Sequence, residues 1–234
     1  MAISRRGALA ATAAGGAGLL VGGLGALPAL ADEDAPAPRR LTPDEALDRL
    51  KAGNRRWRRL DQRHPREGQA TRDRLVAGQH PFALVVGCAD SRVPPELVFD
   101  QGLGDIFDVR SAGQVLDESV LGSVVYGVEH VHIPLIVVLG HSSCGAVTAA
   151  VDVHRGAPLP EGHIGYLVEH ILPVVESTPD TGGDYVKTCV TANARHIAAE
   201  LAADPELTDA VQSGTVHIVA ARYDLDTSRV HFLD

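Results

Sequence analysis

Two short apolar runs in this chain each lead directly into a block of residues whose side chains can bind metal. The run at 82–87 leads into the block Cys88–Arg92, and the run at 134–140 leads into the block His141–Gly145. Apolar runs of this length predict strands that are buried on both faces of a parallel sheet. Because parallel strands end at the same edge of their sheet, we expect the two blocks to converge there.

The rest of the chain alternates between strand-like and helix-like patterns. Further strands are predicted at 106–109 and 215–222. Helices are predicted at 117–131, 143–154, 164–176 and 184–203. This alternation indicates an α/β fold with a mostly parallel central sheet flanked by helices. The last segment, Val216 to Leu233, has two short strands around a turn at 224–227. It is therefore expected to add a C-terminal antiparallel edge strand.

An N-terminal helical arm is expected ahead of the sheet. Thr42 can cap a helix, Pro43 suits its first turn, and Glu45 completes a capping box. Gly53 is predicted to end this helix, because glycine is the usual residue after a helical C-terminus. A second helix is predicted at 70–77.

A basic run at 54–60 surrounds a single tryptophan, Trp57. The formal net charge of the chain is -9, which argues against nucleic acid as a partner. We therefore interpret the run as a solvated helix face around a buried Trp57.

The N-terminal residues have the layout of an export signal. A twin-arginine pattern at 4–7 is followed by an uncharged Ala/Gly/Leu run at 8–30 and an A-x-A cleavage site at 29–31. The alternative is a membrane anchor, since the run is long enough to span a bilayer. Its high Ala/Gly content makes it only weakly hydrophobic, so a cleaved signal is favoured.

The predicted organisation is a signal peptide at 1–31, a polar linker at 32–40 and a single α/β domain at 41–234. Cleavage would leave no stable membrane span in the mature chain. The expected location is periplasmic or extracellular, reached by the twin-arginine route.

The three cysteines leave two interpretations open in an exported protein. Cys88 and Cys144 could bind a metal, or they could form a disulfide in an oxidising compartment. Cys189 lies in a predicted helix and is expected to be a small buried hydrophobic residue.

The combination of Cys88, His141 and Cys144 suits zinc, with one ion per chain. Three protein ligands leave one tetrahedral position open, as a catalytic zinc requires. His141 and Cys144 are predicted to face one point from the start of a helix. Asp90 and Arg92 form a charged pair beside the open position.

The pattern Cys88-x-Asp90-Ser91-Arg92 with Gly140-His141-Ser142-x-Cys144-Gly145 resembles the signature of the β-class carbonic anhydrases. Leu75 to Gln79, Gly104 to Phe107 with Val109-Arg110, and Tyr223 to Leu225 extend the resemblance. The resemblance covers nearly the whole chain after the signal.

The resemblance implies zinc-dependent, reversible hydration of carbon dioxide to bicarbonate and a proton, through attack by zinc-bound hydroxide. Asp90 and Arg92 would be the catalytic pair, and Asp90 could also bind zinc as a fourth ligand in a closed state. The substrate-binding positions implied are Gln79, Phe107, Ala112 and Tyr126. The family also implies a homodimer, or a larger oligomer of dimers, in which the partner subunit completes the pocket.

Three positions depart from the common family pattern. Ala89 replaces a serine, Ser228 stands where a turn glycine is common, and Val85 replaces a tryptophan found in some members. The last change argues against the inhibitory bicarbonate pocket that those members have.

Three other functions are compatible with the same ligands. A structural zinc site usually has four Cys or His ligands, and none is positioned as a fourth here. Hydrolysis of COS or CS2 occurs on the same fold. A binding protein without activity would have no need of the Asp90–Arg92 pair.

Overall fold

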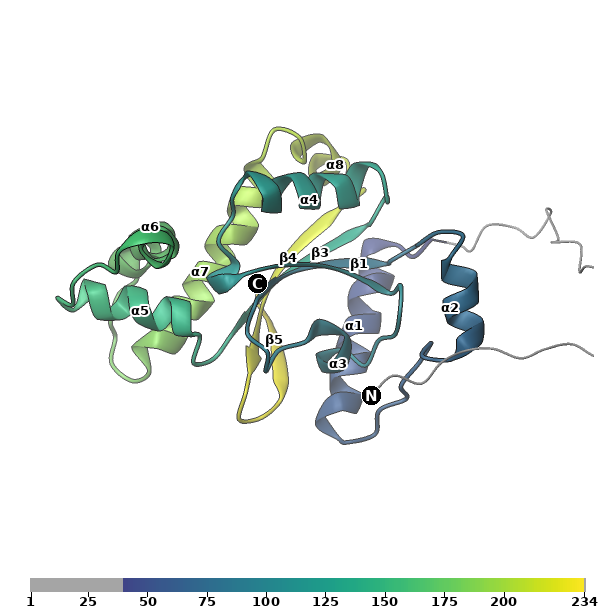
Figure 1. Cartoon of the computed structure of the whole chain (residues 1–234), viewed down its shortest axis with the longest axis horizontal. Helices are drawn as coiled ribbons and strands as arrows, with labels where there is room; N and C mark the ends of the chain where they lie inside the picture. Colours follow the sequence, from purple (N-terminus) through teal and green to yellow (C-terminus); the bar gives the residue numbers. More distant parts are fainter. Residues whose placement is uncertain (1–39, 234) are drawn as a thin grey trace, which may run out of the picture. The chain divides into compact units, whose positions relative to one another are not determined.

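The computed structural model describes residues 40–233 of the chain (Figure 1). The predicted signal peptide and all but the last residue of the predicted linker lie outside the described residues. The elements follow in the order α1 (Pro43–Arg58), α2 (Gln69–Leu75), β1 (Ala83–Cys88), α3 (Pro95–Val98), β2 (Ile106–Ser111), η1 (Ala112–Gln114), α4 (Glu118–Glu129), β3 (Leu135–His141), α5 (Gly145–His154), α6 (Gly162–Ser177), α7 (Tyr185–Ala203), α8 (Thr208–Gln212), β4 (His217–Asp224) and β5 (Arg229–Leu233).

The described strands form one five-stranded sheet in the order β2-β1-β3-β4-β5. The first four run parallel, and β5 pairs antiparallel with β4 in a hairpin. This arrangement confirms the predicted α/β class, including the antiparallel edge strand. Every residue of β1 and β3 is buried, as their continuous apolar sequences predicted.

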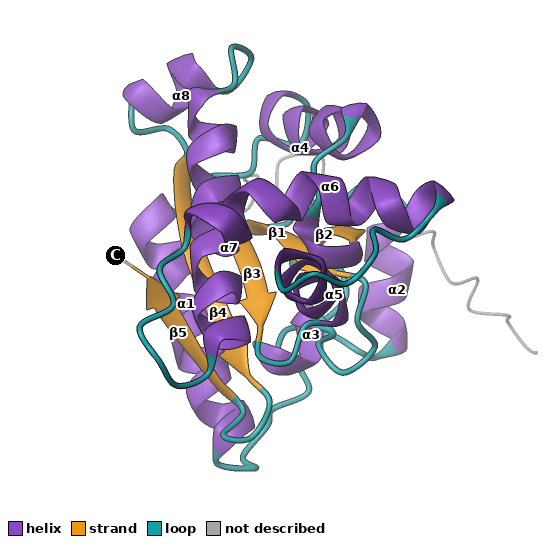
Figure 2. Cartoon of the chain, turned by 90° about the vertical axis from the view of Figure 1, so that its left-hand side faces the viewer, coloured by secondary structure: helices purple, strands orange, loops and turns teal. Residues whose placement is uncertain are grey.

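Helices cover both faces of the sheet (Figure 2). On one face, Leu84, Ile136 and Val138 pack with apolar side chains of α4 and α7. On the other, Val85, Val137 and Leu139 pack with Ala46 and Leu50 of α1. Successive residues of β1 and β3 thus point to opposite cores, as the two-residue repeat of a strand requires.

A third group of buried side chains lies beyond the carboxyl ends of β1 and β3. It joins α5, α6 and the first half of α7, and it contains Cys88, Cys144 and Cys189. Cys189 is completely buried, as predicted for a small hydrophobic residue. The helices α5, α6 and α7 therefore enclose the region into which both sequence blocks project.

The first helix, α1, begins as the sequence predicted but does not end at Gly53. Both hydrogen bonds of the capping box are present, from the Thr42 N–H to Glu45 and from the Glu45 N–H to the Thr42 hydroxyl. The helix continues to Arg58. A Cβ atom at Gly53 would lie 1.6 Å from the carbonyl oxygen of Phe99. Glycine is needed here for close packing of α1 on the chain at Phe99, not for helix termination.

Trp57, the tryptophan of the basic run, is only half-buried. The prediction that it would be buried was therefore wrong. Its indole N–H donates to the Tyr223 hydroxyl at 3.1 Å, while the ring packs against the core beneath α1. An indole packs readily at such a boundary, because it can bury its ring and keep a partner for its N–H.

Most other predicted elements lie within about two residues of their observed limits. The helix predicted at 143–154 begins at Gly145, and the strand predicted at 106–109 continues to Ser111. The short elements α3, η1 and α8 were not predicted, because their sequences are too short for a periodic pattern. Within residues 40–233, no helix is both long and apolar enough to cross a membrane.

Candidate metal centre

The two sequence blocks meet where neighbouring strands end. β1 and β3 are adjacent and parallel, with Gly87 paired to Leu139, so Cys88 and His141 leave the same edge of the sheet. The chain continues from β1 to β2 on one side, whereas β3 lies on the other side of β1. The site therefore occupies a topological switch point, where open α/β sheets bind their ligands.

A tight turn, and not a shared helix face, brings His141 and Cys144 together. His141 is the last residue of β3, and Cys144 is the N-cap residue of α5. Ser143 between them has a φ of 55°, a left-handed conformation that reverses the chain. The prediction that both residues lie at the start of a helix was therefore wrong for His141, although their convergence was right.

The side chains of Cys88, His141 and Cys144 place their ligand atoms within 4.8 Å of one another. All three residues are buried, and the exposed fraction of His141 is 0%. His141 Nδ1 lies 3.0 Å from the Ser142 carbonyl oxygen, which can only accept a hydrogen bond. The proton therefore belongs on Nδ1, and the lone pair on Nε2 faces the two sulfurs.

The unsatisfied Nε2 atom of His141 tests whether these residues suit a metal. It is buried and has no hydrogen-bond partner in the part of the chain that the structure describes. A buried nitrogen lone pair without a donor is costly, and a cation would satisfy it. Two sulfurs and one imidazole nitrogen are the ligand types that zinc prefers, so the cluster fits this ion.

The two thiols are coupled to each other. The contact with Cys144 lowers the pKa of Cys88 to about 4, against the effect of burial. The same contact, together with burial, raises the pKa of Cys144, although the N–H groups of Val147 and Ala146 at the start of α5 act to lower it. The pair therefore readily holds one negative charge. All three cysteines are free, so the structure contains no Cys88–Cys144 disulfide.

Asp90 and Arg92 form the predicted pair beside the cluster. Arg92 Nε donates to Asp90 Oδ1 at 2.9 Å and Nη2 donates to Oδ2 at 2.7 Å, while the Arg92 N–H also reaches Oδ1 at 2.9 Å. Hydrogen bonding from Arg92 lowers the pKa of Asp90 to about 2. Asp90 Oδ2 is also 3.8 Å from His141 Nε2, so an ionised carboxylate stands next to the three ligand atoms.

Sequence reasoning missed the role of Arg110. Its guanidinium donates to the carbonyl oxygens of Cys88 at 2.6 Å, Asp90 at 2.7 Å and Val93 at 3.2 Å. One side chain thus holds the whole segment that carries the first ligand and the acid. An arginine at the carboxyl end of β2 was visible in the sequence, but only the pairing of β2 with β1 shows what it reaches.

Gly113 is a second residue that the sequence did not identify. Its N–H donates to Cys88 Sγ at 3.4 Å, and its φ is 68°. A Cβ atom here would lie 2.6 Å from Ile171 Cδ1. The position therefore combines a left-handed conformation with a close approach to α6, and the hydrogen bond supports the thiolate form of Cys88.

Within one chain, the four predicted substrate-binding residues do not all lie at the cluster. Ala112 follows Ser111, the residue paired with Cys88, and is close to it. Phe107 pairs with Leu84, so it lies about 13 Å back along the sheet. The ring of Tyr126 packs 6.3 Å from that of Phe107, and Gln79 is exposed in the loop after α2. The roles of these residues stay predictions.

The family model described as Carbonic anhydrase matches residues 83–230, which include all three ligand residues. Two similar curated proteins are Carbonic anhydrase 2 of Mycobacterium tuberculosis and a carbonic anhydrase of Mycolicibacterium smegmatis. The first is 40% identical over 82% of this chain and 93% of its own length. The second is 39% identical over 80% of this chain and 92% of its own length.

Solved structures show the same fold. The β-carbonic anhydrase CcaA matches with a TM-score of 0.63 and 23% identity, over 80% of this chain and 95% of its own. A Coccomyxa β-carbonic anhydrase in complex with acetazolamide matches with a TM-score of 0.62 and 25% identity, over 69% of this chain and 75% of its own. The chain therefore belongs to the β-class carbonic anhydrase family, as the sequence motifs indicated.

Proposed function

We propose that this chain catalyses the reversible hydration of carbon dioxide to bicarbonate and a proton, with one Zn2+ held by Cys88, His141 and Cys144. Membership of the carbonic anhydrase family supports the reaction. The observation that carries the metal assignment is the buried, unpartnered Nε2 of His141 facing two free sulfurs. Zinc bound there would lower the pKa of a coordinated water, so that hydroxide becomes available near neutral pH.

The residues around the cluster have separate tasks in this reaction. Asp90 is ionised at any pH well above its pKa of about 2, so it can accept a hydrogen bond from the attacking oxygen and orient it. Arg92 holds the carboxylate through both oxygens, and Nη2 also donates to the Ser143 carbonyl at 3.2 Å. The pair is therefore tied to both sequence blocks.

We propose that the conformation in which Arg92 holds Asp90 is the open arrangement of the site. Both oxygens of Asp90 are occupied by Arg92. Loss of these hydrogen bonds would allow the carboxylate to turn toward the ligand atoms, since Oδ2 is already 3.8 Å from His141 Nε2. We propose that such a turn produces the closed state, in which Asp90 would be the fourth ligand and would exclude water.

The pocket for carbon dioxide is proposed to need a second subunit. Phe107 and Tyr126 pack together at the β2 edge of the sheet, about one strand length from the cluster of the same chain. Tyr126 has an exposed fraction of 48% although it is a large aromatic residue. An exposed aromatic pair at a sheet edge is suited to an interface, so these residues could contribute to the pocket of a homodimer partner.

Stopped-flow measurement of carbon dioxide hydration on the zinc-loaded protein tests this function. The wild-type protein should catalyse hydration, and Asp90→Asn should lose most of the activity while retaining its zinc. Full activity in Asp90→Asn would contradict the assigned role. Release of hydrogen sulfide from COS or CS2, with no hydration of carbon dioxide, would instead identify the protein as a sulfur-analogue hydrolase of the same fold.

We also propose that the protein is exported through the twin-arginine route. The basis is the twin-arginine pattern at 4–7, followed by the uncharged run and a cleavage site. The mature protein should begin at Asp32, and Arg5→Lys with Arg6→Lys should leave the precursor in the cytoplasm. Cell fractionation locates the protein, and N-terminal sequencing of the purified protein identifies its first residue. A wild-type chain that kept its first 31 residues would contradict the proposal.

A further inference from the structure

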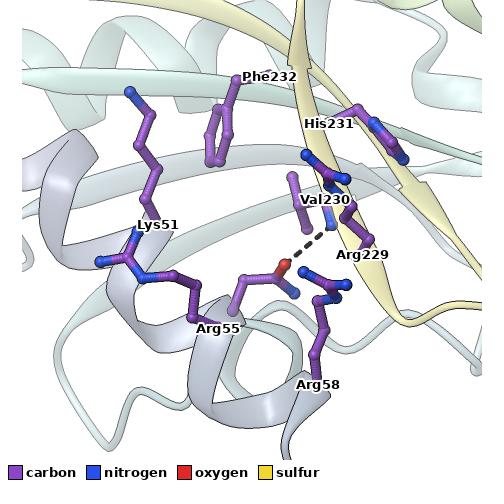
Figure 3. A pocket seen from close by; sticks show the side chains of 8 residues that line it. Lys51, Arg55, Arg58, Arg229, Val230, His231 and Phe232 are labelled. Carbon is purple, nitrogen blue, oxygen red and sulfur yellow. Dashed lines mark hydrogen bonds between the residues drawn. The ribbon is translucent and has the colours of Figure 1, made fainter.

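A pocket away from the metal centre gathers positive charge between α1 and the edge strand β5 (Figure 3). Its volume is about 300 Å³. Lys51, Arg55 and Arg58 line it from α1, where spacings of four and three residues place them on one face of the helix. Arg229 and His231 line it from β5, and none of the lining residues found within 40–233 is acidic.

Within the part of the chain that the structure describes, four cations of this pocket have no ion-pair partner. Across residues 40–233, no carboxylate forms an ion pair with Lys51, Arg55, Arg58 or Arg229, although Arg49, Arg56 and Arg66 nearby each pair with an aspartate. The chain as a whole carries a net charge of -9. Burial, together with the positive charges of Arg222 and Arg229, lowers the pKa of His231. Unpaired cations concentrated in a hollow of an acidic protein create a local positive field that attracts anions.

The walls of the pocket are held by a buried amide. Asn54 has an exposed fraction of 4%, and its Nδ2 donates to the carbonyls of Val98 and Ser228, both at 3.1 Å. Its Oδ1 accepts from the Val230 N–H at 2.9 Å. A dashed line marks this hydrogen bond at Val230 in Figure 3. These bonds connect α1 directly to β5. The spacing between the two groups of cations is therefore set by the fold.

The hydrogen bond from the Val230 N–H to Asn54 shows in which direction alternate N–H groups of β5 point. Because the Val230 N–H faces α1 and not β4, the N–H of Phe232 two residues later also faces this open edge. A backbone donor at a free sheet edge needs a hydrogen-bond acceptor. The Lys51 ammonium lies 5.5 Å from the centre of the ring of the same residue, Phe232.

We propose that this pocket binds a compact, polyvalent oxyanion of the phosphate class. Guanidinium groups bind phosphate oxygens through paired, charge-assisted hydrogen bonds, and three arginines from two elements can surround one such group. The Phe232 N–H at the sheet edge and the Lys51 ammonium are further donors among the lining residues. A volume of about 300 Å³ suits a small molecule bearing one or two phosphate groups. It does not require the extended track of charge that a nucleic acid strand occupies.

Calorimetric titration of the mature protein with inorganic pyrophosphate at low ionic strength tests the proposal. We expect one saturable site per chain, with affinity that falls as salt is added. The double substitution Arg58→Gln with Arg229→Gln should weaken binding about tenfold or more, because it removes contacts from both walls.

A charge-matched control separates a specific site from general attraction. Arg72 and Arg74 on α2 are exposed and lie outside the pocket, so Arg72→Gln with Arg74→Gln removes the same charge elsewhere. This control should bind pyrophosphate as the wild-type protein does. Equal weakening by both double substitutions, or no saturable binding to the wild-type protein, would overturn the proposal.

Backbone NMR of the wild-type protein gives a measurement that does not depend on any variant. Pyrophosphate should shift the amide signal of Phe232 more than signals of α2. Shifts spread over the whole surface would contradict the site. Binding of an oligonucleotide that pyrophosphate fails to displace would show that the pocket recognises a nucleic acid strand instead.

Discussion

The side-chain amide of Asn193 donates to the carbonyl oxygen of Gly113 at 2.9 Å, across 80 positions of sequence. Asn193 lies on α7 and has an exposed fraction of 2%. The N–H of the same Gly113 donates to Cys88 Sγ. The helix α7 supplies no metal ligand. Through Asn193 it nevertheless positions the Gly113 peptide, whose N–H supports the ligand Cys88.

Replacing Asn193 by Ala should weaken both the fold and the metal centre. The Gly113 carbonyl would lose its shorter hydrogen bond and keep only the Gln114 side-chain amide, whose nitrogen can donate at 3.2 Å, at a cost of about 1 kcal/mol in the free energy of unfolding. The looser Gly113 should also allow a chelator to remove zinc faster. Urea unfolding and chelator kinetics measure the two effects, with exposed Glu200→Ala on the same helix as the control. Unchanged chelator kinetics in Asn193→Ala would show that the amide does not support the metal centre.

Gly53→Ala should destabilise the protein strongly. The added Cβ would overlap the Phe99 carbonyl at 1.6 Å, so α1 would have to move away from its core, at a cost of about 3 kcal/mol. The matched change Gly122→Ala in α4 meets no atom within 4 Å. It should stabilise the helix by about 0.5–1 kcal/mol. Thermal unfolding compares the two, and similar effects at both positions would contradict this account of Gly53.

Asp100 should make stability depend on pH in the acid range. Burial acts to raise the pKa of Asp100, but hydrogen bonds from Arg56 and from the N–H groups of Arg63 and His64 hold it below its ordinary value. A carboxyl with a lowered pKa in the folded state stabilises the fold above its unfolded pKa of about 3.9. This contribution is lost progressively as the pH falls below that value.

Asp100→Asn should therefore lower stability at neutral pH by about 3 kcal/mol and flatten its decline in acid. The control Asp180→Asn removes an exposed carboxylate that lies 3.8 Å from Arg155, and it should cost less than about 1 kcal/mol. Urea unfolding at a series of pH values measures both. If the free energy of unfolding fell equally steeply in acid for the wild-type protein and for Asp100→Asn, Asp100 would not be the cause of the pH dependence.

Cys144→Ser should abolish stable zinc binding, whereas Cys189→Ala should retain about one zinc per chain. The two cysteines are equally inaccessible, with exposed fractions of 1% and 0%, but only Cys144 lies in the ligand cluster. Elemental analysis of protein purified without chelators measures the metal. A wild-type protein that contained a Cys88–Cys144 bond and no zinc would contradict the metal centre.

The strands and the ligand residues could be predicted because their signals are local. The apolar runs of β1 and β3 are continuous, so they indicated buried parallel strands before any contact was known. The position of each ligand just after a strand then predicted that Cys88, His141 and Cys144 would converge. Ser228 was noted as standing where glycine is common, and its φ of 55° shows why.

Other features could not be predicted from local patterns. Gly53 matched a helix-ending pattern, yet its role is set by Phe99, which lies 46 positions away. Arg110 reaches three carbonyls only because β2 pairs with β1 in one particular register. The basic run at 54–60 gave no sign that Arg229 and Arg58 would line the same pocket.

The sequence alone thus determined which segments become strands, which side chains can bind zinc, and the family to which the chain belongs. Tertiary structure decided which backbone groups hold those ligands, why α1 carries a glycine in its middle, and where unpaired cations gather. The division has a physical cause. Periodicity and capping depend on neighbours within a few residues, whereas hydrogen-bond partners and close approaches depend on which distant segments the folded chain brings together.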